Sequence, residues 1–468
     1  MPKNATTRDL THGNPMRLIL NFAIPFLFGL LFQQLYSFAD TVIVGRYLGT
    51  DALAAVGATS SINFLIIGFC TGVCNGFVIP VAQQFGAGDI TALRRFVANS
   101  VWLSAGLAGV TAVLVTAFCR PILQMMKTPE DIIDNSYAYI VVIFIGIPVT
   151  YLYNLLAGFI RSLGDSKTPV IFLTIAALLN VGLDLLFILV MQMGVGGAAW
   201  ATVISQAISG LACLFYIRLR FPILHLSREH WKPDKSYIKI LCGMGLPMGL
   251  QYSITAIGSV ILQSAVNTLG SLAVAAVATA NKVGMFVCCP FDAMGATMAT
   301  YAGQNVGARK LKRLGQGMRS CIWLGAGYSV IGFLVVLFAG RAAASLFLSE
   351  NDPVLFDMIE RYLRLNGAFY FTLALVNIIR FMIQGLGFGK LAVVAGVCEM
   401  IARAVAGFLL VPTFGFDAVG FASPLAWTAA DIFLIAAYVH VMKVLRQTVG
   451  EAPDEPEAKL AAELVNEI

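Results

Sequence analysis

Two carboxylates, Asp40 and Asp184, stand inside long apolar runs in the first half of this 468-residue chain. The apolar runs of that half offer them no Lys or Arg at the same depth. An ionisable group inside a membrane is costly and usually belongs to an ion or substrate site. Two buried anions without a basic partner require a proton or a metal cation, so the sequence predicts that the first half binds one of these ions.

Other polar residues accompany the two acids at helical spacing. One helix face would carry Gln33, Tyr36, Ser37 and Asp40. Asn180 precedes Asp184 by one helical turn, so these two side chains would also share a face. Such side chains must turn away from lipid, toward a cavity or one another. The alternative interpretation is an interhelical hydrogen bond that only holds the helices together.

The second half carries charges of both signs inside its apolar runs: Lys282, Asp292, Arg380, Glu399, Arg403 and Asp431. Glu399 and Arg403 are one helical turn apart, which predicts a structural ion pair. Lys282 and Asp292 are candidates for the lining of a substrate cleft, with packing as the alternative. For Asp431, packing or a hydrogen bond is favoured.

The composition indicates that lipid is the solvent for most of the chain. Hydrophobic residues make up 58% and charged residues only 12%, and the mean hydropathy is +0.81. Soluble proteins carry about 25% charged residues. A helix needs about 20 apolar residues to cross a bilayer, and twelve such runs can be placed. The sequence predicts a multi-pass protein of a prokaryotic cytoplasmic membrane.

Lys and Arg collect in the loops on the side of the N-terminus, including the clusters 218–239 and 309–319. Arg161 and Arg380 are expected on the same side. By the positive-inside rule, both termini are expected in the cytoplasm. The net charge of +6 is then a topology signal, and no nucleic-acid partner is expected.

The chain also repeats itself. Leu48-Gly49 recurs as Leu269-Gly270, 221 residues later, and Gln83 recurs with the same offset as Gln304. The expected fold class is an all-α membrane protein, with twelve transmembrane helices in two six-helix lobes related by a pseudo-two-fold axis along the membrane normal. The expected parts are a cytoplasmic N-terminus (1–15), an N-lobe (16–220), a cytoplasmic linker (221–237), a C-lobe (238–444) and a cytoplasmic tail (445–468).

Several segments together resemble one family. They are Pro25, Gln33–Thr41 with Gly45, Gln83 with Gly86-Ala87, Arg161–Asp165, Leu179–Asp184 and Gly303–Arg309. The ordered set, spread over nearly the whole chain, is similar to the multidrug and toxic compound extrusion (MATE) transporters. The resemblance implies two lobes around a central cleft and export of amphipathic, often cationic compounds, driven by inward flow of H⁺ or Na⁺.

The resemblance is to the DinF-like prokaryotic branch of that family. It implies a coupling site for a cation or proton at Asp40, Asn180, Asp184 and Thr202. These oxygen ligands suit Na⁺, with Asp40 and Asp184 as its metal ligands, yet the two carboxylates could equally bind a proton. Other branches carry a Glu in the seventh helix, where residues 251–256 here hold no acid. This departure argues against a Na⁺ site of that kind in the second lobe.

The resulting hypothesis is antiport by alternating access. Candidate residues of the substrate cleft are Gln33, Gln34, Tyr36, Ser37, Lys282 and Asp292. The expected partners are the bilayer and small-molecule drugs or metabolites. No cofactor beyond the transported ion is expected, and the chain is expected to be a monomer.

Other functional classes fit the sequence less well. The segment from Gly385 to Lys390 lacks the spacing of an ATP-binding phosphate loop, and the four histidines are scattered or lie in loops, which argues against an enzyme. A channel does not explain the paired lobes. The alternative kept is a flippase for lipid-linked precursors, from a related superfamily with the same two-lobe plan. Those proteins usually have extra helices and a strongly cationic cavity.

Overall fold

A computed structural model describes residues 7–126, 128–346 and 352–450. Within these ranges the chain forms helices and no strands. Ten of the described helices are long and apolar enough to cross a membrane, and the number rises to 12 if each of two bent helix pairs is one span. The predicted fold class is confirmed.

The N-lobe contains α1 to α8. Their bounds are α1 Pro15–Leu48, α2 Thr50–Ala87, α3 Ile90–Ala117, α4 Cys119–Met125, α5 Ile133–Ile145, α6 Ile147–Ser162, α7 Lys167–Leu185 and α8 Gly194–Arg220. A π-helical segment, Leu186–Val190, extends α7. A short 3-10 turn, Pro222–Leu224, lies between α8 and α9.

The C-lobe contains α9 to α16. Their bounds are α9 Lys235–Asn267, α10 Ser271–Gly307, α11 Leu311–Ser345, α12 Pro353–Gly367, α13 Tyr370–Gly385, α14 Gly389–Val405, α15 Val411–Phe414 and α16 Phe416–Thr448. A second π-helical segment, Ala406–Leu410, joins α14 to α15. The tail expected at 445–468 begins within α16, and its residues from 451 on lie outside the described ranges.

Polar caps begin several of these helices. Asp89, Asp234 and Asp352 each accept a hydrogen bond from a backbone N–H in the first turn of α3, α9 and α12. Such a bond satisfies one of the N–H groups that a helix start leaves without an intrahelical partner. Pro353 follows its cap directly and fits there because proline lacks an N–H group.

The internal repeat is visible in the backbone. Each lobe has one bent pair, α5 with α6 at 46° and α12 with α13 at 50°. Each lobe also places a glycine with positive φ between its first two helices, Gly49 at 88° and Gly270 at 95°. A side chain is strained in this conformation, which explains why glycine recurs there.

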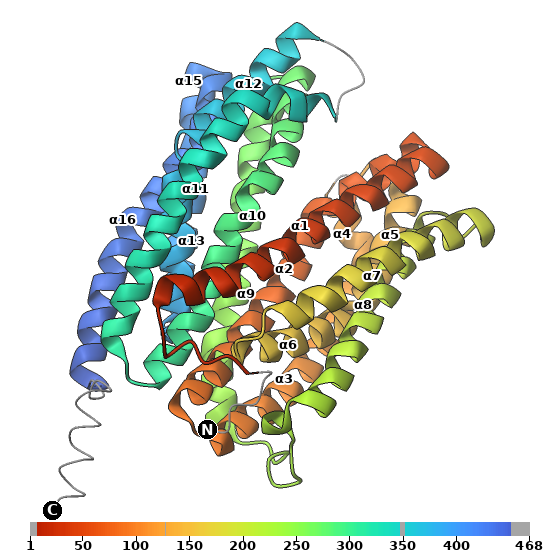
Figure 1. The fold of residues 1–468 in the computed structure, drawn as a ribbon. Coiled ribbons are helices and arrows are strands. Elements are labelled where there is room, and N and C mark those ends of the chain that lie inside the picture. The colour runs from red at the N-terminus through yellow and green to blue at the C-terminus, as the bar shows by residue number, and fades with distance from the viewer. Residues whose placement is uncertain (1–6, 127, 347–351, 451–468) are drawn as a thin grey trace, which may run out of the picture.

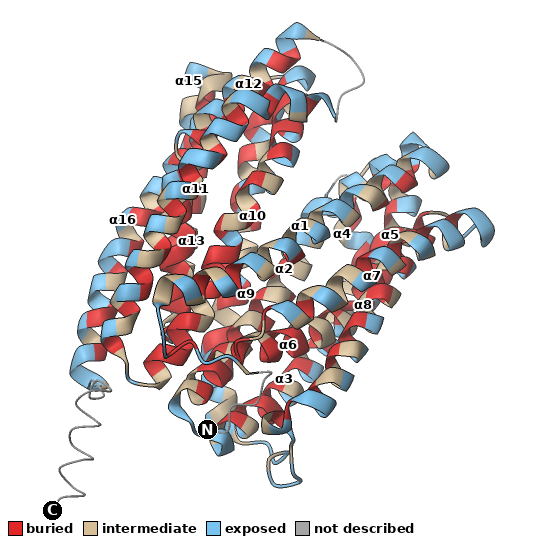
Figure 2. Cartoon of the chain, viewed as in Figure 1, coloured by how far each residue is buried: buried red, intermediate tan, exposed pale blue. Residues whose placement is uncertain are grey.

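Each lobe has its own apolar core, and the two cores are centred on different helix sets. The lobes lie together at the end of the molecule that holds the termini and diverge toward the opposite end (Figure 1). Many lipid-side residues of α7, α8, α11 and α16 are exposed, whereas the helices between the lobes are mostly buried or half-buried (Figure 2). This pattern fits a protein whose outer surface meets lipid rather than water.

Helix α1 belongs to both lobes. Near its start, Ile19 and Phe22 join the apolar core of the C-lobe, and its later part packs along α7 of the N-lobe. Pro25 lies between these two parts. A proline inside a helix removes a hydrogen bond and favours bending at that point. The residue therefore stands where α1 passes from one lobe to the other.

Candidate functional site

The two predicted carboxylates meet in the N-lobe. Asp40 of α1 and Asp184 of α7 interact with each other, and the two residues are 8% and 0% exposed. Both oxygens of Asp184 and one oxygen of Asp40 are buried and have no hydrogen-bond partner among the described residues. No described Lys or Arg lies within ion-pair distance of either acid. Two facing carboxylates of this kind need a cation or a proton between them.

Polar groups from two more helices surround the acids. Asn180 donates from Nδ2 to Oγ1 of Thr202 on α8 at 3.4 Å, while its own Oδ1 is buried without a partner in the described structure. Tyr139 of α5 is buried and interacts with both Asp40 and Asp184. The site therefore combines carboxylate, amide and hydroxyl groups from four helices, α1, α5, α7 and α8.

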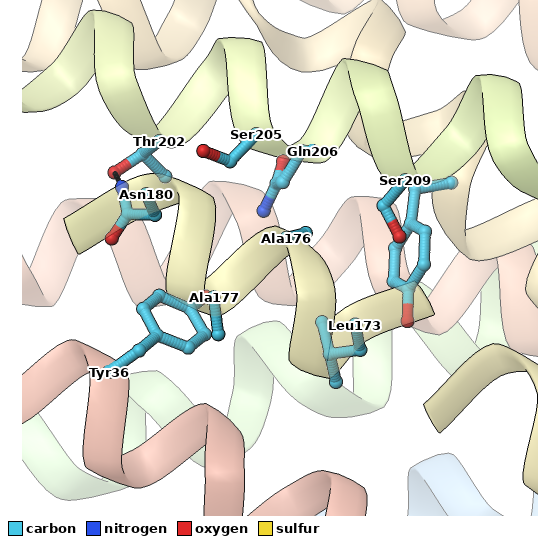
Figure 3. A pocket seen from close by; sticks show the side chains of 10 residues that line it. Tyr36, Leu173, Ala176, Ala177, Asn180, Thr202, Ser205, Gln206 and Ser209 are labelled. Carbon is cyan, nitrogen blue, oxygen red and sulfur yellow. Dashed lines mark hydrogen bonds between the residues drawn. The ribbon is translucent and has the colours of Figure 1, made fainter. Parts of the chain in front are cut away.

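A small cavity of about 20 Å³ adjoins this site. Figure 3 shows the Asn180 amide beside the Thr202 hydroxyl, with further polar side chains of α8 along the same face. They recur at helical spacing: Thr202, Ser205, Gln206 and Ser209. The volume is enough for about one water molecule. Ser209 Oγ is buried without a partner among the described residues, as expected of a group that faces such a polar space.

A much larger cavity, of about 530 Å³, lies between the lobes. Its lining comes from both lobes and includes aromatic side chains: Phe26, Tyr36, Phe64, Tyr252, Phe381 and Trp427. Four residues line both the large and the small cavity: Tyr36, Tyr153, Leu173 and Gln206. Among them, Tyr36 is also an electrostatic neighbour of Asp40, so it connects the acid pair to the central cavity. A volume of this size matches pockets that bury drug-sized molecules, which occupy about 300–1,000 Å³.

The buried charges of the C-lobe are arranged differently. Glu399 of α14 pairs with Arg380 of α13 and also lies 3.5 Å from Arg403, measured between Oε2 and Nη2. All three side chains are less than 10% exposed. Asp431 of α16 is buried with no hydrogen-bond partner among the described residues, and Arg380 is its electrostatic neighbour. The C-lobe thus supplies two fixed cations to Glu399.

Two hydrogen bonds join the lobes at the terminal end of the central cavity, and they are formed by repeat-related residues. Gln83 of α2 donates to the carbonyl of Gly385 at 3.0 Å, and Gln304 of α10 donates to the carbonyl of Ser162 at 2.8 Å. Gln83 and Gln304 are repeat-related, and so are Ser162 and Gly385. The two bonds therefore cross between the lobes in opposite directions: one donor lies in the N-lobe and the other in the C-lobe.

Two glycines allow this close approach. A Cβ atom at Gly86 would lie 1.9 Å from the carbonyl oxygen of Gln304, and one at Gly307 would lie 1.8 Å from that of Gln83. No side chain tolerates such a distance to backbone, so the sequence repeat of Gln and Gly encodes the contact between α2 and α10. The central cavity is closed by this contact at the end where the termini lie.

The N-terminal segment, residues 7–14, strengthens the same closure on one side. The Leu10 backbone N–H donates to Oε1 of Gln304 at 2.9 Å, and the Arg8 N–H donates to the Leu163 carbonyl at 3.0 Å. Arg313 of α11 donates to the Gly13 carbonyl at 3.0 Å. The segment therefore binds both lobes, with the buried Leu10 side chain in the core of the C-lobe.

The structure brings together some of the predicted site residues and separates others. Asp40, Asn180, Asp184 and Thr202 are neighbours in the N-lobe. Gln33, Tyr36 and Asp292 line the central cavity. The lining does not include the other three cleft candidates, Gln34, Ser37 and Lys282. Lys282 and Ser37 are exposed on their helices, and Gln34 is half-buried.

Sequence reasoning missed several residues of the site. The sequence places Arg161 with the basic loops, and it places Arg380 both with those loops and among the charges of the apolar runs. Both residues line the central cavity. Both stand near the ends of the second helix in a bent pair, where a sequence pattern suggests a loop. Tyr139 and three members of the polar row of α8, Ser205, Gln206 and Ser209, are not singled out by the sequence either. The i, i+3, i+4 and i+7 spacing of Thr202, Ser205, Gln206 and Ser209 is a signal that could have found that row.

Known proteins resemble this chain along most of its length. The sequence model of the MatE family matches residues 25–186 and 247–409, one match in each lobe. "Probable multidrug resistance protein YpnP" of Bacillus subtilis is 30% identical over 365 residues, which cover 77% of this chain and 80% of that protein. "Probable multidrug resistance protein YoeA" of the same organism is 33% identical over 342 residues, with 71% and 73% covered.

Solved structures share the fold. One is described as the outward-facing conformation of a multidrug resistance MATE family transporter of the MOP superfamily. It has a TM-score of 0.87 and 22% identity, and covers 94% of this chain and 98% of the other. A MATE crystal structure in complex with MaL6 has a TM-score of 0.89 at 22% identity, with 96% and 100% covered. At 22% identity, this similarity shows a shared fold alone.

Proposed function

Since this chain belongs to the MATE family of multidrug efflux transporters, we propose that it is an antiporter that exports amphipathic compounds in exchange for H⁺ or Na⁺. As a member of that family it is a multi-pass plasma-membrane transporter and not an enzyme. The observation that carries the proposal is the Asp40–Asp184 pair, two facing buried carboxylates with no Lys or Arg of the described residues within ion-pair distance. Tyr36 connects this pair to a cavity large enough for a drug.

The proposed cycle follows from these positions. With both termini in the cytoplasm, the closure by Gln83 and Gln304 seals the cytoplasmic side and the cavity belongs to the outward-facing state. An ion that enters through the cavity neutralises Asp40 and Asp184. A bound ligand shifts a conformational equilibrium only through unequal affinity for the two states. Neutralisation of Asp40 would provide that difference, because α1 is packed against both lobes and contains Pro25 between the two contacts.

The flippase alternative is less well supported. The central cavity carries Asp292 and Glu399 beside its arginines, so its charge is mixed rather than strongly cationic. The acid pair of the N-lobe has no evident role in moving a neutral or anionic lipid headgroup. We therefore retain drug efflux as the function that the site favours.

The decisive experiment measures dye efflux from proteoliposomes across whose membrane a defined ion gradient is imposed. Fluorescent amphipathic dyes, one cationic and one zwitterionic, are loaded separately, and a pH gradient or a Na⁺ gradient is imposed, one at a time. Dye should leave under only one of the two gradients, and the ion of that gradient is then the coupling ion. The double variant Asp40→Asn/Asp184→Asn should not respond to either gradient, while the exposed control Asp51→Asn should behave as wild type. Equal efflux by the double variant would reject the proposal.

A further inference from the structure

Among the described residues that line the central cavity, one cation and one anion have no ion-pair partner, and the two come from different lobes. Arg161 of α6 lines the cavity, and among the described residues no carboxylate lies within ion-pair distance of its guanidinium. Its recorded contact is with the ring of Phe26, at 5.4 Å from the centroid. Asp292 of α10 lines the same cavity, is exposed to it, and likewise has no ion-pair partner in the described structure.

The two charges lie around the same tyrosine. Tyr252 of α9 is within electrostatic range of Arg161, Asp292 and Arg380. Tyr252 also lines the cavity and offers its hydroxyl group and an aromatic face there. The cationic and anionic groups are therefore neighbours of one central side chain and not features of opposite ends of the molecule.

The other charged side chains that line the cavity already form ion pairs with one another. Glu399 is held by both Arg380 and Arg403, so this acid has no capacity left for a ligand cation. Arg380 still has one donor, Nε, that is buried and unpartnered among the described residues. Arg380 is also an electrostatic neighbour of Asp292, but no ion pair joins the two among the described residues.

We propose that the central cavity takes zwitterionic amphipathic compounds, with the ligand's anionic group on Arg161 and its cationic group on Asp292. A substrate that carries both charges satisfies both poles, whereas a simple cation leaves the guanidinium without a partner and is repelled by it. Charges placed in this way select a partner by complementarity. The aromatic lining, including Phe64 and Trp427, accommodates an apolar body between the two charged groups.

The location of Arg161 gives such a ligand a further consequence. Arg161 immediately precedes Ser162, whose carbonyl accepts the cross-lobe hydrogen bond from Gln304. An anionic group bound there lies next to the contact that joins the lobes, while the cationic group rests on the C-lobe. A zwitterion would therefore bridge the two lobes. This inference rests on the proposed transport function, because it assigns the substrate class of the same cavity.

The test compares two forms of one fluorescent xanthene dye, the cationic methyl ester and the free carboxylic acid, which is a zwitterion. Binding to the purified full-length protein is measured in detergent by fluorescence anisotropy. The wild-type protein should bind the acid about tenfold more tightly than the ester, which is a difference of about 1.4 kcal/mol in binding free energy. Equal or tighter binding of the ester, or no binding of either form, would overturn the proposal.

Variants of Arg161 and Asp292 test which residue causes the preference for the acid form. Arg161→Gln should weaken the acid about tenfold and leave the ester unchanged or tighter, whereas Asp292→Asn should weaken both forms. Arg161→Lys keeps the charge and should retain most of the acid binding, which controls for misfolding. Arg17→Gln removes an exposed charge outside the cavity and should change neither. A loss of both forms in Arg161→Gln that Arg161→Lys does not reverse would contradict the assignment.

The outcome is separable from that of the transport experiment. Dye binding in detergent needs no ion gradient, so it reports on the cavity even where gradient-driven efflux fails. Absence of efflux for every dye under both gradients would reject antiport. Loss of the preference for the acid form, with efflux intact, would reject only the zwitterion site.

Discussion

The N-lobe and the C-lobe share a backbone plan but neutralise their buried acids in different ways. In the N-lobe, Asp40 and Asp184 face each other without a described basic partner. In the C-lobe, Glu399 is held between Arg380 and Arg403. A guanidinium is a permanent counter-ion, whereas a proton or Na⁺ can be exchanged. In the proposed function, the Asp40–Asp184 pair exchanges the ion, whereas Glu399 keeps a fixed charge arrangement.

The difference also explains why we propose one coupling site, although the sequence is repeated. The helix pairs α5–α6 and α12–α13, and the helices α7 and α14 that follow them, occupy corresponding places. On α7 the buried polar residues are Asn180 and Asp184, while α14 has Glu399 and Arg403. Duplication therefore conserved the scaffold, and the side chains on corresponding helices took different roles.

The largest expected effect comes from the exchangeable pair. Asp40→Asn and Asp184→Asn each keep the size of the side chain and remove its negative charge. Each should lower ion-driven efflux at least tenfold, which lies within the range of about 5- to 150-fold for coupled sites. Efflux rates in proteoliposomes, normalised to inserted protein, provide the measurement.

The double variant tests whether these two acids act as one site. Residues that act as a unit are not additive, so the double variant should be no worse than the more impaired single variant. Multiplication of the two single losses would show two independent sites. Normal gradient-driven efflux by both single variants would move the search to Asp292 and Asp431 in the C-lobe.

The second prediction concerns the fixed arrangement of the C-lobe. Glu399→Gln leaves Arg380 and Arg403 buried side by side without an acid, and should lower the free energy of unfolding by about 3–5 kcal/mol. Arg403→Gln should cost less, about 1–3 kcal/mol, because Glu399 keeps its contact with Arg380. Denaturant unfolding of the purified protein in detergent, followed by Trp fluorescence, measures both.

A double variant distinguishes the three-residue arrangement from a simple pair. Glu399→Gln/Arg403→Gln removes one acid and one base, but leaves Arg380 buried alone. It should be more stable than Glu399→Gln and less stable than Arg403→Gln. An isolated Glu399–Arg403 pair, as the sequence alone predicts, would instead make the double variant the most stable of the three.

These residues also show what a sequence can and cannot predict. Asp40 and Asp184 were recognisable because a charge inside an apolar run is costly wherever the run packs. Glu399 and Arg403 were recognisable because helical spacing alone brings them together. Arg380 joins them from another helix, and no local rule predicts a contact between α13 and α14 at that level. That contact is a product of tertiary packing.

Arg161 illustrates the same limit. It precedes Ser162 and Leu163 at the end of α6, where a basic residue normally indicates a cytoplasmic loop. The 46° bend between α5 and α6 and the packing of α6 against α2 place its side chain in the cavity instead. The fold class and the number of spans needed only composition and periodicity, so they were predictable.

The third prediction compares the repeat-related glutamines that close the cavity. Gln83 makes one cross-lobe bond, whereas Gln304 both donates to Ser162 and accepts from the backbone of Leu10. A net hydrogen bond contributes about 0.5–1.5 kcal/mol. Gln304→Ala should therefore open the terminal end of the cavity more often than Gln83→Ala. Thiol labelling of an Ala82→Cys reporter, which lines the cavity, measures that opening. Equal labelling in both variants would remove the N-terminal segment from the closure.

The smallest expected effect is that of Asp9, which orders the N-terminal segment. Asp9 Oδ1 accepts from the Thr11 N–H at 2.7 Å, and Oδ2 lies 2.6 Å from Nδ1 of His12. Burial raises the pKa of the Asp9 carboxyl, but its bonds to Thr11 and His12 lower the pKa more, and the result lies below 3.8. A carboxyl with a lowered pKa stabilises the docked segment above its unfolded pKa, and this stabilisation disappears as the pH falls through the lower, folded value.

Docking of the segment should consequently be independent of the Asp9 carboxyl between about pH 5 and pH 8, where that group stays ionised. Since both Asp9 and His12 are about half exposed, Asp9→Asn should cost less than about 1 kcal/mol. Hydrogen exchange of the Leu10 and Thr11 amides should be slightly faster in Asp9→Asn than in wild type, with little change at Arg8. An effect on efflux as large as that of Asp40→Asn would instead make this segment part of the ion-exchanging machinery, and the division between an exchangeable and a fixed lobe would no longer hold.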